Sequence, residues 1–284
     1  MKVIRLSKRR LEELDRIFGE LEKTLLRSLR QLRYLTANQI RRLHFTDNAS
    51  LHAAQRATRR MMSKLQGYGV VESLERRIGG VRAGSNAFVW TLTEAGIHLL
   101  HLNDPEYSFR KRGFEPSLNF LNHTLAVAEV YVQLVELCKR KQLELVKTEL
   151  EPVCWRGYTG EDGKPATMKP DMYAVTDDGK YEDSWFIEVD LATESPHKIL
   201  NKCRRYVYYC RSGIEQEKHR IFPMVVWLVF SINRKNKLMQ YIAECREMSE
   251  PSKTLFVVIT PDEFETLICN GVDALAKTKG DECA

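Results

Sequence analysis

Six residues, Trp-Phe-Ile-Glu-Val-Asp at positions 185–190, decide the fold expected for the C-terminal part of this chain. The run is largely apolar, which is typical of a strand in the centre of a sheet. Lys-Pro-Asp at positions 169–171 begins another strand-like stretch. Because side chains alternate along a strand, Glu188 and Asp190 share a face. The sequence therefore predicts three carboxylates, those of Asp171, Glu188 and Asp190, near the ends of two adjacent strands.

The segments around these strands predict a mixed α/β unit. An apolar helix is expected over 118–141, and the polar, glycine-containing stretch 156–167 is expected to form a hairpin or loop. Further strands are expected over 143–155, 171–175, 185–189, 223–230 and 254–259, with helices over 195–210 and 235–247. The order α-β-β-β-α-β-α-β is that of a restriction-endonuclease-like core with a mixed central sheet.

The carboxylate spacing resembles that of the PD-(D/E)xK nucleases, in which an Asp, a Glu or Asp, and a Lys two residues later hold a divalent cation and an attacking water. Mg²⁺ or Mn²⁺ would suit Asp171, Glu188 and Asp190, because hard cations prefer oxygen ligands. Glu129 on the preceding helix is a further candidate ligand. Asp190 stands where those nucleases have the lysine. This departure favours a non-catalytic protein unless another lysine takes that place.

Two lysines of the next helix, Lys198 and Lys202, are candidates to replace that lysine, since they lie four residues apart on one face. The segment Lys202 to Tyr206 also resembles, imperfectly, the QxxxY helix of some exonuclease-like nucleases. A structural alternative stays open, in which Glu188 and Asp190 pair with Lys198, Lys202 or Arg205 in an ion network. His123 is more simply explained as a satisfied core or interdomain residue than as a catalyst.

The N-terminal part predicts a winged helix-turn-helix. One amphipathic helix is expected over 7–30, and Thr36 with Gln39 forms a capping-box pattern before a short helix. Ser50 is positioned to cap a third helix that ends near residue 65. Strands over 70–74 and 87–92 then flank a glycine-rich loop, as the strands of a wing do.

Charge supports DNA contact by this part. Residues 1–115 contain 22 Lys and Arg against 12 Asp and Glu, a balance of +10, whereas residues 116–284 contain 22 against 26, a balance of −4. A basic segment concentrates near phosphates. The candidate DNA-binding residues lie on the third helix and in the wing: Gln55, Arg56, Arg59, Arg60, Arg76, Arg77 and Arg82. Winged helices also mediate protein contacts, which is the alternative.

Composition excludes several classes. The chain has no run of about 18 apolar residues and no signal-peptide pattern, so we expect a cytosolic protein without a membrane span. Its seven cysteines form no CxxC pair, which argues against both a disulfide framework and a zinc ribbon. Four parts are expected: a winged helix over 1–102, a linker over 103–117, a nuclease-like domain over 118–262 and a tail over 263–284.

Three features together resemble the replication-relaxation family of plasmid and mobile-element proteins: the winged helix, Asn-His-Thr-Leu-Ala-Val at 122–127 and Phe-Ile-Glu-Val-Asp-Leu-Ala-Thr-Glu-Ser at 186–195. The resemblance implies a role in the replication, relaxation or mobilisation of such elements. Candidate partners are double-stranded DNA, replication or mobilisation proteins, and a second copy of the chain in a homodimer. Two hypotheses follow, a Mg²⁺-dependent endonuclease or nickase and a non-catalytic DNA-binding regulator with a degenerate nuclease fold.

Overall fold

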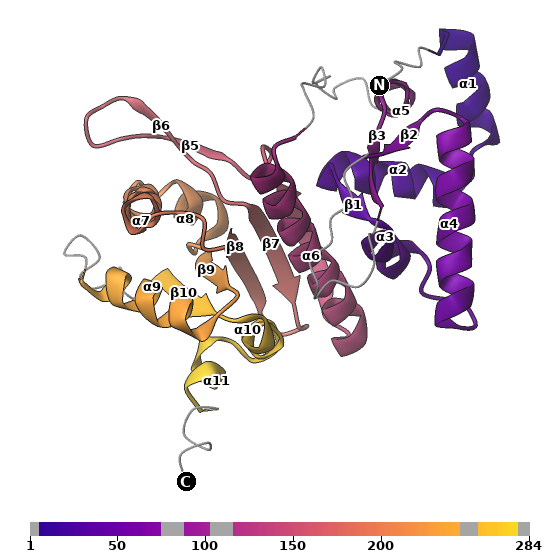
Figure 1. The fold of residues 1–284 in the computed structure, drawn as a ribbon. Helices are drawn as coiled ribbons and strands as arrows, with labels where there is room; N and C mark the ends of the chain where they lie inside the picture. The colour runs from indigo at the N-terminus through magenta and orange to yellow at the C-terminus, as the bar shows by residue number, and fades with distance from the viewer. Residues whose placement is uncertain (1–5, 75–87, 103–115, 245–254, 278–284) are drawn as a thin grey trace. The chain divides into compact units, whose positions relative to one another are not determined.

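The chain divides into two compact units, residues 1–136 and 137–284. The computed structural model describes residues 6–74, 88–102, 116–244 and 255–277 (Figure 1). The division falls inside the long helix α6 (Leu118–Lys141), whose last turn belongs to the second unit. The domain boundary expected in the linker over 103–117 stays a prediction, because most of that segment lies outside the described residues. None of the described helices is both long and apolar enough to span a bilayer.

Before α6, the first unit contains the helices α1 (Lys8–Ile17), α2 (Glu20–Leu32), α3 (Ala37–His44), α4 (Leu51–Gly67) and α5 (Glu94–His101). The single helix expected over 7–30 is wrong, because α1 and α2 are separated at Phe18 and Gly19. Both residues have extended backbone. Phe18 is buried, and its ring lies 5.5 Å from that of Tyr68. Since the leucine period continues through both helices, the pattern did not reveal the break.

The caps predicted in this unit are confirmed. The Gln39 backbone N–H donates to Thr36 Oγ1 at 3.2 Å, and the Thr36 backbone N–H donates to Gln39 Oε1 at 2.9 Å. Ser50 Oγ accepts from the Ala53 backbone N–H at 3.2 Å at the start of α4. These bonds satisfy backbone donors that the first turn of a helix leaves unpaired. They fix where α3 and α4 begin.

A small antiparallel sheet completes the first unit. Its order is β1-β3-β2, with β1 (Leu35–Thr36), β2 (Val71–Ser73) and β3 (Val89–Leu92), so the two strands expected around the glycine-rich loop are present. The loop between them, which contains Arg76, Arg77 and Arg82, lies outside the described residues. The assignment of this unit as a winged helix therefore stays a prediction.

The second unit is built on a five-stranded mixed sheet of order β10-β9-β8-β7-β4. Its strands are β4 (Glu144–Leu150), β7 (Met172–Asp177), β8 (Glu182–Asp190), β9 (Met224–Val229) and β10 (Phe256–Ile259). The pairs β4–β7 and β7–β8 are antiparallel, whereas β8–β9 and β9–β10 are parallel. The prediction of a mixed sheet with the 185–190 strand at its centre is confirmed.

Two helices, α7 (Pro196–Arg211) and α9 (Ile232–Glu244), pack on one face of this sheet. The core there joins Phe186 and Trp227 of the strands to Tyr206 of α7 and Leu238 of α9. Between α7 and β9, the short helix α8 (Ile214–His219) is an element that the sequence did not predict. This face positions every side chain of the candidate site.

Further elements lie at the edges of the second unit. The expected hairpin is formed by β5 (Arg156–Thr159) and β6 (Pro165–Met168), and Figure 1 shows it beside α7 and α8. The segment expected as a C-terminal tail is helical over much of its length. After a 3₁₀ turn, η3 (Pro261–Glu263), it contains α10 (Phe264–Asn270) and α11 (Val272–Lys277). The apolar residues Phe264, Leu267 and Ile268 are buried, which explains the added structure.

Candidate functional site

Glu188, on the central strand β8, is the most deeply buried carboxylate of the candidate site, with none of its surface exposed. Its Oε1 accepts a hydrogen bond from the Tyr206 hydroxyl at 2.5 Å, and its Oε2 accepts one from Lys202 Nζ. Both partners project from α7, where four residues separate them on one face. The helix therefore provides a hydroxyl and an ammonium to one buried carboxylate.

Asp171 completes the cluster from the neighbouring strand. The register of β7 and β8 pairs Met172 with Ile187, so one step further Asp171 faces Glu188. Asp171 Oδ2 accepts from the Val189 backbone N–H at 2.8 Å, and Asp171 Oδ1 lies 3.7 Å from Lys202 Nζ. One ammonium thus lies against two carboxylates. We refer to Asp171, Glu188, Lys202 and Tyr206 as the Lys202 cluster.

Burial and charge act in opposite directions within this cluster. Burial raises the pKa of Glu188 to about 8, although the positive charge of Lys202 opposes the change. For Lys202, burial disfavours the ammonium, but the carboxylates of Asp171 and Glu188 outweigh it and hold its pKa above the ordinary value. Burial, followed by the charge of Glu188, raises the pKa of Tyr206 well above its ordinary value. Lys202 therefore stays charged, and Tyr206 stays a hydrogen-bond donor.

Asp190 is on the same strand face as Glu188, but the structure gives it a different partner. Its two carboxylate oxygens lie 2.5 Å from Arg234 Nε and 3.2 Å from an Arg234 terminal nitrogen. The Ala192 backbone N–H also donates to Asp190 at 2.9 Å, and Arg234 donates to the Glu194 carbonyl at 3.0 Å. Asp190 thus forms a bidentate ion pair with Arg234 of α9, and Arg234 also binds the turn before α7. The catalytic and metal-binding role expected of Asp190 stays a prediction.

Three other candidates are not members of the Lys202 cluster. Glu129 belongs to the first unit, where its carboxylate pairs with Arg42 and accepts from Gln39 Nε2 at 3.1 Å. Glu129 therefore has partners within the first unit, and its role as a metal ligand stays a prediction. Lys198 is exposed in the first turn of α7, so Lys202, one turn later, is the lysine that reaches the carboxylates. His123 is half-buried on α6.

The donor set partly matches what a divalent cation needs. Among the described residues, no group of three or more His, Cys, Asp or Glu side chains is arranged to hold a metal. However, Asp171 Oδ1 and Glu188 Oε2 both face the positive charge of Lys202. Mg²⁺ keeps several waters and is often held by only one or two carboxylates, so these two oxygens fit such an ion in number and chemistry.

The candidate DNA-binding residues of α4 form an exposed strip. Gln55, Arg56, Arg59 and Arg60 are all exposed, whereas Ala54, Thr58, Met62 and Leu65 of the same helix are buried. In the part of the chain that the structure describes, none of the three arginines forms an ion pair. We call Gln55, Arg56, Arg59 and Arg60 the α4 strip.

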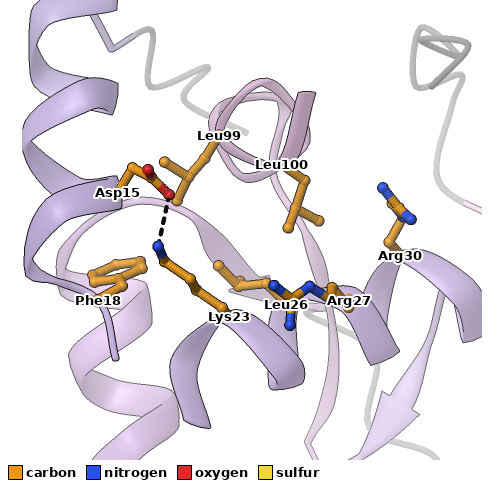
Figure 2. A pocket seen from close by; sticks show the side chains of 8 residues that line it. All are labelled: Asp15, Phe18, Lys23, Leu26, Arg27, Arg30, Leu99 and Leu100. Atoms are coloured by element: carbon orange, nitrogen blue, oxygen red, sulfur yellow. Dashed lines mark ion pairs between the residues drawn. The ribbon is translucent and has the colours of Figure 1, made fainter. Parts of the chain in front are cut away.

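Two features were not found from the sequence. Arg234 lies 44 residues from Asp190, and no local pattern marks it as the partner. In the first unit, residues from α1, α2 and α5 line a hollow of about 130 Å³, and Figure 2 shows their side chains. Its wall includes Phe18, Leu26 and Arg27, and an ion pair of 3.1 Å joins Asp15 to Lys23. The hollow shares no residue with the Lys202 cluster or the α4 strip, so it is a separate feature.

Comparison with known proteins gives one match. A family model described as replication-relaxation matches residues 26–225, which is more than half of the chain. No curated protein matches the sequence, and no solved structure matches it. The matched range includes the α4 strip and all four residues of the Lys202 cluster.

Proposed function

The chain belongs to the replication-relaxation family, and on that premise we propose that it binds double-stranded DNA and nicks it with the Lys202 cluster. Membership implies a role in the replication or relaxation of plasmids or other mobile elements. DNA is therefore the expected partner. The nicking activity is a finer proposal that depends on the geometry of the second unit.

The observation that carries the proposal is the position of Lys202. The sequence lacks a lysine two residues after Glu188, but Lys202 Nζ lies 3.7 Å from Asp171 Oδ1 and is hydrogen-bonded to Glu188. An Asp, a Glu and a Lys therefore meet in space as the three chemical groups of a PD-(D/E)xK site do. The lysine comes from the helix after the strand rather than from the strand itself.

Each residue of the cluster has a role in this proposal. Asp171 and Glu188 would hold Mg²⁺, which when bound offsets charge that develops on the phosphate and lowers the pKa of a bound water. Lys202 would orient the attacking water by hydrogen bonding and stabilise negative charge beside it. Tyr206 fixes the Glu188 carboxylate through its hydroxyl, since both groups are fully buried.

The first unit supports the DNA-binding part. Its helices α3 and α4 follow one another across a short turn, and β2 and β3, the two strands expected beside the wing, pair antiparallel. The α4 strip adds three exposed arginines to a segment whose charge balance is +10 over residues 1–115. An exposed basic helix with a polar Gln can contact both phosphates and base edges. We therefore assign duplex binding to this unit.

The test is a plasmid nicking assay. Supercoiled plasmid is incubated with the full chain and Mg²⁺ or Mn²⁺, and nicked circles are separated on a gel. Asp171→Asn, Glu188→Gln and Lys202→Met are expected to abolish nicking, while Lys237→Met, an exposed lysine of α9, is expected to preserve it. Thermal unfolding of each variant separates loss of activity from loss of fold. Absence of metal-dependent nicking by the wild type, or nicking that survives all three substitutions, would contradict the proposal.

One observation favours a second candidate function, a non-catalytic DNA-binding regulator. Glu188 is fully buried and both of its oxygens already have partners, as in an ion network that serves stability. In that case the chain would bind duplex DNA without nicking it, and calorimetry would detect no Mg²⁺ binding. Metal binding that is lost in Asp171→Asn would instead favour the nuclease.

A further inference from the structure

Helix α7 differs in charge from the rest of the C-terminal part. It contains five Lys and Arg residues and no Asp or Glu: Lys198, Lys202, Arg204, Arg205 and Arg211. Residues 116–284 have a balance of −4, and without these five cations the balance would be −9. The helix that provides Lys202 to the cluster thus has a net charge of +5 within a part whose overall balance is negative.

Three of these residues share one side of the helix. Lys198, Lys202 and Arg205 follow the spacing i, i+4, i+7, so their side chains lie along one strip. Lys198 and Arg205 are exposed, and Lys202 between them is 25% exposed with its ammonium on the two carboxylates. Seven residues of helix extend about 10 Å, and successive phosphates of one DNA strand advance about 3.4 Å along the duplex axis. The length of the strip therefore matches about three phosphate steps. We call Lys198, Lys202 and Arg205 the α7 strip.

The outer members of the strip differ from other cations of the same unit. Arg156 pairs with Glu149 and Glu215, Arg234 pairs with Asp190, and Lys235 pairs with Glu263. Within the described part of the chain, neither Lys198 nor Arg205 forms an ion pair. Their charge is therefore available to a ligand from solution, and an anion need not displace a carboxylate to bind there.

The start of α7 adds to the positive field. The helix has 16 residues, its N-cap Ser195 makes no side-chain capping bond, and Pro196 occupies the first turn. Pro196 has no N–H and the Lys198 N–H donates to the Ser195 carbonyl, so it is the helix dipole that favours an anion at this end. Lys198 lies in this first turn. The dipole and the side chains of the strip thus favour the same kind of ligand.

We propose that the α7 strip is a second DNA-binding surface, which holds the phosphate backbone of duplex DNA so that one phosphodiester lies beside Lys202 and Asp171. This inference rests on the DNA-binding part of the proposed function and extends it to the second unit. The α4 strip provides affinity through the first unit, and the α7 strip presents the backbone to the cluster. It explains why the acidic C-terminal part, residues 116–284, contains a helix with basic but no acidic residues.

The experiment measures duplex binding of the full chain by fluorescence anisotropy at several salt concentrations, with EDTA so that cleavage plays no part. The test variant is Lys198→Gln with Arg205→Gln. The matched control is Lys218→Gln with Lys237→Gln, which removes two exposed charges from α8 and α9. Each lost phosphate contact lowers the slope of log K against log salt by about 0.9. The test variant is thus expected to lose about 1.8 in slope, and from 50 to 200 mM salt the wild type should weaken about 12-fold more than this variant.

The outcomes separate this inference from the proposed function. A reduced slope in the α7 variant with a wild-type slope in the control supports the α7 strip. Equal slopes in all three proteins overturn it, and a parallel Arg59→Gln, Arg60→Gln variant then shows whether the first unit still accounts for binding. If the wild type binds no duplex at all, the inference and the DNA-binding part of the proposed function both fail. All four substituted positions of the two variant pairs are exposed, and far-UV circular dichroism checks that the fold is kept.

Discussion

The hydrogen bond from Tyr206 to Glu188 leads to a sharp prediction about stability. Tyr206→Phe removes only the hydroxyl, and the ring keeps its place in the core beside Phe186, 5.8 Å away between ring centroids. Glu188 Oε1 then loses the donor at 2.5 Å, while Oε2 keeps Lys202. Because Glu188 has no exposed surface, water cannot replace the lost donor without a rearrangement.

A matched control lies three residues further along the same helix. The Tyr209 hydroxyl donates to Glu215 Oε1 at 2.8 Å, and both side chains are buried. However, Glu215 Oε1 also accepts from Arg156 Nε at 2.8 Å, so Tyr209→Phe leaves that oxygen with a charged partner. The two substitutions therefore make the same chemical change at two buried carboxylates, and they differ in whether the acceptor oxygen keeps a donor.

The expected magnitudes follow from that difference. At pH 9, above the pKa of about 8 for Glu188, the acceptor is a carboxylate. A hydrogen bond to a charged group contributes about 1.5–3 kcal/mol, and an acceptor left unpaired in the interior adds its desolvation cost. We expect Tyr206→Phe to lower the free energy of unfolding by about 2–3 kcal/mol and Tyr209→Phe by about 1 kcal/mol. Urea denaturation in EDTA at this pH, followed by fluorescence of the buried Trp185 and Trp227, measures both values. An equal or smaller loss for Tyr206→Phe, at unchanged m-value, would refute the account of the cluster.

Two further predictions concern the first unit. A Cβ at Gly96 would lie 2.1 Å from the Val70 carbonyl oxygen, so Gly96→Ala should lower the free energy of unfolding by about 3 kcal/mol in chemical denaturation. As the control, Gly67→Ala should not destabilise the protein, because a Cβ at Gly67 has no atom within 4 Å. Equal effects of the two substitutions would contradict the close approach at Gly96. The hydrogen bond from Lys64 holds the pKa of Glu22 below its ordinary value of 4.5, so its stabilising effect is present above that pH and is lost as the pH falls through the lowered pKa. Between pH 7 and pH 3, the midpoint temperature of thermal unfolding should fall less steeply with pH in Glu22→Gln than in the wild type. The same pH dependence in both proteins would count against the ion pair of Glu22 with Lys64.

Much of the architecture could be predicted because its causes are local. The capping box of Thr36 and Gln39, the cap at Ser50 and the apolar strand at 185–190 each depend on neighbours within a few residues. The main failure was the helix break at Gly19, where the leucine period continued across an interruption. The spacing of apolar residues does not mark where one helix ends: Leu14 and Leu25 are buried on either side of the break, whereas Ile17 and Leu21 beside it keep the period but are exposed.

The sequence by itself determined the order of the elements and the face that Glu188 and Asp190 share, because both follow from local propensity and from the alternation of strand side chains. Only the tertiary structure decided the partners. Lys202 pairs with Asp171 and Glu188, and Arg234, 44 residues after Asp190 in the sequence, pairs with Asp190. Glu129 pairs with Arg42, 87 residues from it. The physical reason is that spacing assigns a side chain to a face, whereas its ion-pair partner depends on how each helix is placed and rotated, and core packing sets both.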